Sequence, residues 1–462
     1  MSAISPARKA AFGILLAVER GKAHSHSDDL LRREEVSALT SADRNLTTTL
    51  VLGVLRWQIR LDEQLKGLLK RPGSKLEPEV SIALRLGAYQ LLFLDRIPAH
   101  AAIDESVELA KQSGHRFAAG MVNAVLRKLR SGEGPAAPRF GSSEETPAGL
   151  AMAQAHPAWM VERWCNIYGF EAARAICRYG QSQPVLTLRV EGPAVEAELT
   201  HAGIQLEPGA LLAAARAVVS GDVAATAAVR EGRARIQDEG SQLIAELAAC
   251  PGENLNQKVK SIVDTCAAPG GKTLILAERN PGAQIVACES SPQRLAQLRR
   301  RLAAYAGRVE CRLADATALK EEPAFDVALV DAPCSGTGTL GRNPEIRHRL
   351  GLEDLPRQAE RQRAILNAAL RAVRRGGRVV YSTCSLEPEE NEQVVAAVLT
   401  ENHNAQQVSF APVIEALLGK GILRADGAER LRKCLTPEGA LRLLPGGFLG
   451  DGFFVALIEK TA

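Results

Sequence analysis

The spacing of apolar residues divides the chain into an N-terminal part with helical periodicity and a C-terminal part of alternating strands and helices. Between residues 6 and 130, apolar side chains recur three or four positions apart, as in Ile14, Ala17 and Val18. This spacing predicts an all-helical unit of about six helices. From Gln237 onward, short apolar runs alternate with helical stretches. The alternation predicts an α/β fold with a doubly wound parallel sheet.

Between these parts lie a stretch rich in Gly, Pro and Ser and a short mixed region. Residues 131–146 (SGEGPAAPRFGSSEET) have the composition of a linker. After them come a helix beginning near HPAWMVERW, a strand over VLTLRV and further short elements to about residue 235. The sequence therefore predicts three domains: residues 1–135 all-helical, residues 151–235 a small α+β unit, and residues 236–462 the α/β unit.

Within the α/β unit, five apolar runs predict parallel strands. They are SIVDTC from Ser261, QIVACE ending at Glu289, VECRLAD ending at Asp315, Val327 to Val330, and RVVYSTCS from Arg378. A helix is predicted from Leu355 to Arg375, closed by Gly376 and Gly377. The final pair, LRLLP and GFFVALIE, predicts an antiparallel hairpin at the edge of the sheet.

Two of the predicted strands are followed by a cysteine. The run ending at Asp331 continues into Pro333 and Cys334, and the next strand ends in Cys384. Because a strand–helix–strand unit is a right-handed crossover, the two strands should be parallel and adjacent, about 4.8 Å apart. Cys334 and Cys384 should then face one pocket. A pair of buried structural cysteines is the alternative, and two equivalent strand ends make that coincidence the less favoured interpretation.

The turn after the first strand carries the features of a cofactor site. Gly270 and Gly271 allow a ligand to approach the backbone at a helix N-terminus. A phosphate loop is excluded, because Cys266 stands where its first glycine is required. Glu289 is placed to bind a ribose diol, and Asp315 the amino group of an adenine. A nicotinamide dinucleotide would also suit the glycines and Glu289, but the antiparallel terminal hairpin and the lack of a G-x-G-x-x-G string favour S-adenosylmethionine.

Composition narrows the class of protein. The net charge is +4, yet residues 1–130 carry 20 Lys or Arg against 14 Asp or Glu, which fits either a nucleic-acid contact surface or a solvated helical surface. No apolar run approaches the roughly 20 residues of a membrane span, and the N-terminus lacks a signal-peptide pattern. Nine cysteines without a CxxC pair argue against a disulfide framework and a zinc site. We therefore expect a cytoplasmic protein without a metal.

Several motifs carry a resemblance to a known family. DTCAAPGGKT, DAPCSGTG and STCS, with NPEI at Asn343 and PEENE at Pro388, resemble the Sun family of RNA cytosine-5 methyltransferases. The segments LRLGAYQLLFLDRIPAHAAIDESVELAK and GMVNAVLRK resemble the NusB-type RNA-binding domain of the bacterial small-subunit rRNA enzyme of that family. The resemblance covers essentially the whole chain. It implies a NusB-like bundle, a small RRM-like domain and a Rossmann-like methyltransferase domain.

The same resemblance implies an activity and roles for individual residues. The activity is S-adenosylmethionine-dependent methylation of C5 of a cytidine in RNA, with 16S rRNA the favoured substrate and a monomeric enzyme expected. Cys384 would attack C6 of the base, Cys334 would remove the C5 proton, and Asp331 would bind at N3. The expected cofactor-binding residues are Cys266, Ala267, Ala268, Pro269, Gly270, Gly271, Lys272, Glu289, Asp315 and Asp331. Asp is common in the family at position 289, so Glu289 departs mildly from the pattern and lengthens the reach.

Other functions remain open or are disfavoured on stated grounds. A cytosine-5 methyltransferase acting on tRNA, or on another rRNA position, would share every motif. A non-catalytic NusB-like RNA-binding factor is disfavoured, because a degenerate sheet would be expected to lose the cofactor turn or one cysteine, and all are present. DNA cytosine enzymes place their nucleophile after a Pro in the earlier motif and need no second cysteine.

Overall fold

The computed structural model describes residues 4–21, 26–73, 75–132, 144–250, 259–319, 323–447 and 450–461. The chain forms two compact units: one contains residues 1–183 and 340–349, and the other residues 184–339 and 350–462. We call these unit 1 and unit 2. The predicted linker lies mostly outside the described residues, as does the predicted boundary at residue 135, so the three predicted domain ranges stay predictions.

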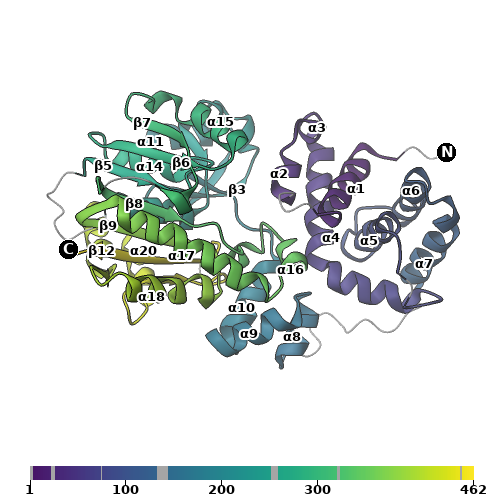
Figure 1. Cartoon of the computed structure of the whole chain (residues 1–462). Coiled ribbons are helices and arrows are strands. Elements are labelled where there is room, and N and C mark those ends of the chain that lie inside the picture. Colours follow the sequence, from purple (N-terminus) through teal and green to yellow (C-terminus); the bar gives the residue numbers. More distant parts are fainter. Residues whose placement is uncertain are drawn as a thin grey trace. The chain divides into compact units, whose positions relative to one another are not determined.

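Unit 1 is built from helices (Figure 1). Its elements are α1 (Pro6–Glu19), α2 (Ser27–Leu31), α3 (Glu34–Ser37), α4 (Ser41–Leu68), α5 (Pro78–Phe93), α6 (Ala99–Gln112), η1 (Arg116–Ala118), α7 (Ala119–Ser131), α8 (Pro147–Ala153), α9 (Ala158–Tyr168), α10 (Phe170–Gln181) and α16 (Ile346–Arg349). The all-helical prediction for the N-terminal part is thereby confirmed. Residues 151–183, included in the predicted middle domain, pack within unit 1.

The core of unit 1 follows from the three-and-four spacing of its apolar residues. On α1, Leu15 and Val18 are buried against the inner faces of α4 and α5. Helices α4 and α5 cross closely because Gly53 lacks a side chain, since a Cβ there would stand 2.0 Å from the ring of Tyr89. Pro6 and Pro78 begin their helices at the first turn, where a missing N–H costs nothing.

A segment distant in sequence completes unit 1. Residues 340–349, which follow the Cys334 loop, pack among the N-terminal helices. The Arg347 side chain is buried and donates to the carbonyl oxygen of Gly180 at 2.9 Å. The buried carboxylate of Glu345 accepts from the Ser27 hydroxyl at 2.7 Å and its N–H at 3.1 Å. The NPEI motif lies within the range predicted for the methyltransferase domain, and nothing in its sequence indicates these partners in unit 1.

Unit 2 contains a four-stranded and an eight-stranded sheet. The smaller sheet has the antiparallel order β2-β3-β1-β4. Its elements are β1 (Thr187–Val190), α11 (Pro193–His201), β2 (Gln205–Pro208), β3 (Ala215–Ser220), η2 (Val223–Ala225), α12 (Ala227–Arg230) and β4 (Ala234–Ile236). The predicted strand over VLTLRV is confirmed as β1.

The larger sheet has the strand order β10-β12-β9-β8-β5-β6-β7, with β11 paired to β12. Its strands are β5 (Ser261–Asp264), β6 (Gln284–Glu289), β7 (Val309–Leu313), β8 (Phe325–Asp331), β9 (Val373–Thr383), β10 (Ala405–Val408), β11 (Leu441–Leu443) and β12 (Phe453–Lys460). Its helices are α13 (Glu239–Ala249), α14 (Gly271–Arg279), α15 (Pro292–Arg301), α17 (Asp354–Ala372), α18 (Glu392–Glu401), α19 (Ala411–Gly419) and α20 (Ala425–Lys433), with short turns η3 (Ala303–Tyr305), η4 (Ala316–Ala318), η5 (Thr337–Thr339) and η6 (Pro388–Glu390).

Helices cover both faces of this sheet, as the doubly wound prediction requires. Helices α17 and α18 pack in the apolar cluster that holds Val330 and Tyr381. Helices α13, α14 and α15 pack in the cluster of the opposite face, which holds Val327 and Leu329. Strands β7, β6, β5, β8 and β9 run parallel, so their carboxyl ends meet at one edge.

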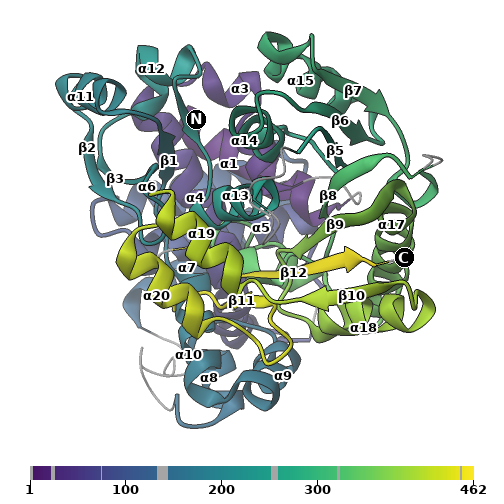
Figure 2. The ribbon, with the colours of Figure 1, turned by 90° about the vertical axis from the view of Figure 1, so that its left-hand side faces the viewer.

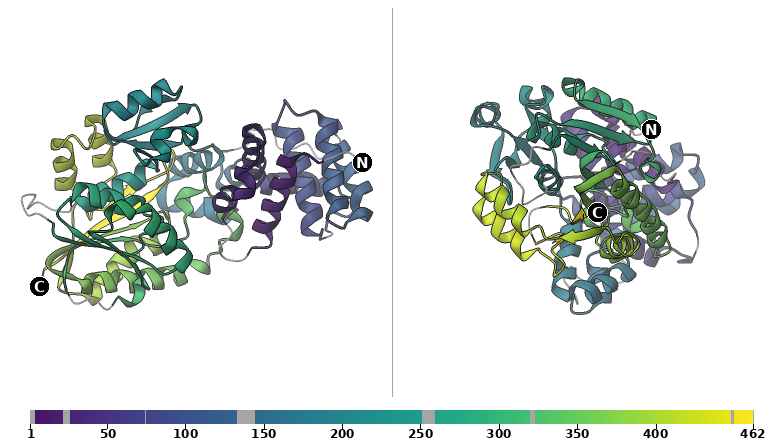
Figure 3. Two further views of the ribbon diagram at one scale, coloured as in Figure 1. Left: turned by 90° about the horizontal axis from the view of Figure 1, so that it is seen from above. Right: turned by 60° about the vertical axis from the view of Figure 1, so that its left-hand side comes forward.

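The predicted antiparallel hairpin of β11 and β12 forms beyond β9, and β10, which was not predicted, joins it: β11 and β10 pair with successive parts of the outer side of β12. Figure 2 shows β12 between β9 and β10, and in Figure 3 the same strand is yellow. Two other local predictions for this unit were wrong. The predicted helix to Arg375 ends at Ala372, because Val373 already pairs with Phe325. The third strand ends at Leu313 and not at Asp315, whose side chain instead caps η4.

Candidate active site and cofactor site

The two cysteines lie together at the carboxyl ends of adjacent strands. Strands β8 and β9 pair in parallel with Asp331 opposite Ser382. Beyond them the loops stay linked, because Gly338 N–H donates to the Cys384 carbonyl at 2.9 Å. The sulfur atoms of Cys334 and Cys384 are 3.3 Å apart. The predicted pairing of these strands and the approach of the two thiols are therefore present in the structure.

The pocket favours the neutral form of the Cys334 thiol. The hydrogen bond with Cys384, and then burial, raise the pKa of Cys334 well above its ordinary value, and the charge of Glu390 acts in the same direction. Cys334 therefore keeps its proton at neutral pH, and in the contact between the two sulfur atoms either one could be the donor. An S–H donor stabilises a thiolate, which is the reactive form of a cysteine.

Asp331 is held in place by two neighbours. One carboxylate oxygen accepts from the Lys272 ammonium at 2.7 Å, and the other from the Ser382 hydroxyl at 2.9 Å. Burial opposes the charge on Lys272, but the attraction of Asp331 outweighs it and the pKa of Lys272 is raised. The ion pair ties the helix after the cofactor turn to the strand that leads to Cys334.

The turn between β5 and α14 brings backbone to the carboxyl edge of the sheet. Ala267 N–H donates to the Cys288 carbonyl at 2.9 Å, and Gly270 N–H closes a tight turn onto the Ala267 carbonyl at 2.7 Å. Gly270 has a φ of 98°, and a Cβ there would stand 2.9 Å from Leu298. Both the conformation and the space require glycine at this position. Burial raises the pKa of Cys266 to about 12, so this thiol is not a third nucleophile.

Two further acids stand on the neighbouring strands. Glu289, the last residue of β6, is buried and accepts from the Ser291 N–H at 2.8 Å, with Arg294 at 3.5 Å. Asp315 follows β7, is exposed, and accepts from the N–H and hydroxyl of Thr317. Those hydrogen bonds lower the pKa of Asp315, the backbone one most. Asp331, Glu289 and Asp315 thus all lie at the edge of the sheet where the carboxyl ends of the parallel strands meet.

Asp264 is a fourth acid at the carboxyl ends of these strands, and it was not among the predicted site residues. It ends β5, is 1% exposed, and one of its oxygens accepts from the Thr273 hydroxyl at 2.7 Å. The other oxygen has no hydrogen-bond partner among the described residues. Burial, reinforced by the charge of Asp331, raises the pKa of Asp264 to about 6. The sequence does carry a signal for this residue, because Asp264 is an acid between an apolar run and the glycine turn. The predicted strand SIVDTC includes it.

These features test whether the residues present fit S-adenosylmethionine. The glycine turn offers backbone at close approach, Glu289 and Asp315 suit the hydroxyls and amino group of an adenosine, and a buried Asp264 oxygen is left to accept a hydrogen bond. The fit is good. The fold and this site define a Rossmann-like S-adenosylmethionine-dependent methyltransferase.

Comparisons with known proteins identify the family. Residues 254–459 match the 16S rRNA methyltransferase RsmB/F model, residues 5–131 the NusB family, and residues 156–218 the ferredoxin-like domain of RsmF/B-like methyltransferases. The chain is 35% identical to a probable ribosomal RNA small subunit methyltransferase B of Bacillus subtilis, over 98% of both chains. It is 34% identical to ribosomal RNA small subunit methyltransferase B of Pseudomonas putida, again over 98% of both.

The fold has a counterpart among solved structures. The crystal structure of PH0851 matches 99% of this chain and 100% of its own, with a TM-score of 0.77 and 23% identity. The chain belongs to the RsmB/F family of 16S rRNA methyltransferases, and it is an S-adenosylmethionine-dependent rRNA methyltransferase. The resemblance drawn from the cysteine motifs and the N-terminal helices is confirmed, and so are the fold class and the cofactor.

No group of three or more His, Cys, Asp or Glu in the described residues could hold a metal ion. Among the helices of the same residues, none is long and apolar enough to cross a membrane.

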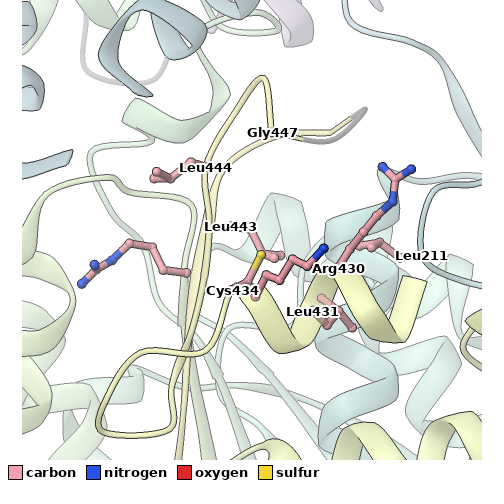
Figure 4. Close-up of a pocket in the computed structure, with 9 residues that line it drawn as sticks. Leu211, Arg430, Leu431, Cys434, Leu443, Leu444 and Gly447 are labelled. Atoms are coloured by element: carbon pink, nitrogen blue, oxygen red, sulfur yellow. The ribbon is translucent and has the colours of Figure 1, made fainter. Parts of the chain in front are cut away.

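A separate cavity of about 290 Å³ lies in unit 2, lined by α20, β11 and Leu211 (Figure 4). Leu431, Leu443 and Leu444 make its wall apolar, and Arg430 and Lys433 also line it. Both basic residues are in the last turn of α20, where cations offset the negative end of the helix dipole. Their charge is thus accounted for without a ligand.

Proposed function

We propose that this enzyme methylates C5 of a cytidine in RNA through a covalent bond between Cys384 and the base. The observation that carries the proposal is the pair of thiols 3.3 Å apart on adjacent strand ends. C5 of cytosine is a poor nucleophile, so its methylation calls for a group that adds to C6 and a second group that removes the C5 proton. Two cysteines with separate roles supply both.

Cys384 is the nucleophile in this mechanism. A free thiol with a pKa near 8.5 is only a few per cent ionised at neutral pH, so a neighbour must assist. The proton kept by Cys334 provides that assistance by donating toward the Cys384 sulfur. Attack at C6 forms the S–C6 bond and makes C5 electron-rich. The bound cofactor supplies the methyl group that C5 takes.

Cys334 completes the reaction. Cys334 first releases its own proton to solvent, and its thiolate then takes the proton from C5. The electrons of that C–H bond form the C5=C6 double bond, the S–C6 bond breaks, and Cys384 leaves as a thiolate. The high pKa of Cys334 suits this step, because a thiolate of high pKa is a strong proton acceptor. Asp331 is assigned to the base at N3, where its carboxyl group, oriented by Lys272 and Ser382, would stabilise the adduct.

The cofactor-binding assignment follows the edge of the sheet. We assign the turn from Cys266 to Lys272 to the methionine end and the backbone contacts, Glu289 to the ribose, and Asp315 to the adenine. Asp331 borders both this site and the base. None of these assignments requires a metal ion.

We propose 16S rRNA as the substrate, on the names of the relatives and on the surface of the NusB-like part. Helix α7 exposes Arg127, Lys128 and Arg130, and the turn before it exposes Arg116 and Phe117, whose ring is 81% exposed. Exposed cations with an aromatic ring suit phosphates and an unstacked base. We also propose that the enzyme acts as a monomer in the cytoplasm, a reducing compartment that suits nine free cysteines.

The test separates the two cysteines. With labelled RNA and S-adenosylmethionine, Cys334→Ala should leave attack and methyl transfer intact but block proton removal, so a slow band should appear on a denaturing gel. Cys384→Ala should give neither band nor product. Cys165→Ala, a half-buried cysteine of α9 in unit 1, is the matched control and should behave as the wild type. The reverse pattern would exchange the two roles, and no band in either variant would count against the covalent route.

A second measurement tests the position and the substrate. RNA carrying tritium at cytosine C5 should release it to water as methylation proceeds, and retention of the label would contradict C5 as the target. Bisulfite sequencing of rRNA and tRNA from a deletion strain should show one lost 5-methylcytosine in 16S rRNA. Loss in tRNA or at another rRNA position instead would replace that substrate.

A further inference from the structure

The carboxylate of Glu390 lies between the loops that carry the two cysteines. Glu390 ends η6, in the PEENE segment, and its side chain is fully buried. One of its oxygens accepts from the Ser335 N–H at 2.8 Å and from Gln362 at 3.0 Å. The other accepts from the hydroxyls of Ser335 and Ser385. Each serine directly follows a cysteine, so one carboxylate holds both loops.

Further hydrogen bonds hold the residues on either side of each cysteine. Gln362, which donates to Glu390, also donates to the carbonyl of Pro333 at 2.9 Å, on the other side of Cys334. Asn391 plays the same part at the second loop: its amide donates to the Ser385 carbonyl at 2.9 Å and its oxygen accepts from the Thr383 hydroxyl. The backbone around both cysteines is thus fixed, and Glu390 joins the two halves.

We propose that Glu390 is a positioning residue that sets the distance between the thiols of Cys334 and Cys384 by binding Ser335 and Ser385 at once. A buried carboxylate needs such donors, because an ionised carboxyl group without hydrogen bonds is expensive to bury. Hydrogen bonds to a charged acceptor are also stronger than neutral ones. The network therefore couples the loops more tightly than the contact between the serine hydroxyls, 3.0 Å apart, would alone.

A role in catalysis follows from geometry. Cys384 must reach C6 while Cys334 reaches the proton on the neighbouring carbon, so the two sulfur atoms must be spaced for one base. A misplacement of about 1 Å can cost on the order of 100-fold in rate. This consequence rests on the proposed function, whereas the spacing of the thiols is a property of the free protein.

The experiment therefore measures the thiols directly. A bifunctional thiol reagent should bridge Cys334 and Cys384 in the wild-type protein, and mass spectrometry of the digested protein identifies the bridged peptides among those of the other cysteines. Glu390→Ala should slow this bridging at least about tenfold and lower kcat on the order of 100-fold. KM for RNA and for S-adenosylmethionine should change little. Glu390→Gln, which keeps the shape and one acceptor oxygen, should recover part of both losses.

A matched control is Glu401→Gln. Glu401 also bridges two elements, binding Arg363 and Asn367 of α17 from the end of α18, but it is exposed and takes no part in the cysteine loops. It should leave the bridging rate and kcat unchanged. If Glu390→Ala does not fold, Ser385→Ala removes the link from the carboxylate to the Cys384 loop, together with the contact to the Ser335 hydroxyl and the hydrogen bond from the Glu387 N–H. It should show the same two losses, smaller in size.

The outcomes decide the proposal. Unchanged bridging in Glu390→Ala and in Ser385→Ala would overturn it, as would a loss confined to KM. Slower bridging with reduced kcat supports it. The proposed function fails separately: if wild-type enzyme does not release tritium from cytosine C5, the C5 chemistry falls while a changed bridging rate still stands.

Discussion

Asp264 gives a prediction whose magnitude can be worked from the structure. Its carboxyl group is 1% exposed and has one oxygen without a partner among the described residues. Burial raises its pKa from 3.8 to about 6, with Asp331 adding to the shift and Thr273, Lys272 and the Cys266 N–H opposing it. Strongly shifted pKa values of this kind are common at sites that bind ligands.

The shift makes stability depend on pH with a definite sign. Between pH 3.8 and about 6, the folded protein binds more protons at Asp264 than the unfolded chain does. The free energy of unfolding therefore falls as the pH rises through this window. Two pKa units at about 1.4 kcal/mol each give a loss of about 3 kcal/mol across the whole window. About 2 kcal/mol of it should fall between about pH 4.5 and pH 7.

Asp264→Asn removes the titration and keeps the size of the side chain. The variant starts from a different stability, because its amide must also be buried, so the informative quantity is the change in the free energy of unfolding with pH. Relative to wild type, the free energy of unfolding of the variant should rise by about 2 kcal/mol from about pH 4.5 to pH 7. Urea unfolding measures this free energy. The transition of unit 2 is recognised because S-adenosylhomocysteine, which binds the folded unit, shifts it to higher urea concentration.

The control is Asp326, a carboxylate in the same unit whose pKa is shifted in the opposite direction. Asp326 accepts from the N–H groups of Lys260 and Ser261 and binds Arg374. Burial opposes its charge, but these partners outweigh burial and lower its pKa. Its contribution to stability is present above its unfolded pKa and is lost as the pH falls, so Asp326→Asn should lose stability relative to wild type as the pH rises. Parallel pH profiles for Asp264→Asn and wild type would refute the reasoning.

Two further predictions concern the cofactor and the RNA. Asp315→Ala should lower the affinity for S-adenosylmethionine about tenfold, since one hydrogen bond to a carboxylate is lost. Because Asp315 is exposed, the fold should stay intact. Unchanged affinity by calorimetry would remove Asp315 from the site. Replacing Arg127, Lys128 and Arg130 by Ala should lower the salt slope of RNA binding by about 2, at about 0.7 per lost phosphate contact, and an unaltered slope would assign this surface another partner. Substitution is preferable to deleting the bundle, because residues 340–349 pack in the same unit.

Local pattern was sufficient wherever a structural element depends on its own residues. The three-and-four spacing of Ile14, Ala17 and Val18 predicted a helix, and the apolar run before Asp331 predicted a parallel strand. Crossover handedness then predicted that β8 and β9 are parallel neighbours, with Cys334 and Cys384 facing one pocket. The resemblance in the cysteine motifs supplied the family.

Tertiary structure decided whatever depends on partners far apart in sequence. The acids predicted at the ends of the strands were Glu289, Asp315 and Asp331. Asp264 was not among them, since nothing in the sequence shows that burial leaves one of its oxygens without a partner among the described residues. The two serines held by Glu390 lie 55 and 5 residues from it, and only the fold brings them to one carboxylate. Likewise, only the fold adds β10 to the outer side of β12, where the predicted partner β11 also pairs.

The order of apolar and polar residues thus determined which elements form and where their carboxyl ends lie, because helix and strand periodicities are local and parallel strands share one edge. It also determined which thiols meet. The burial of Asp264, the packing of residues 340–349 within unit 1 and the bridge made by Glu390 were decided by the tertiary structure alone. Burial, pKa and hydrogen-bond partners are set by neighbours in space, and one chain order is compatible with many sets of such neighbours.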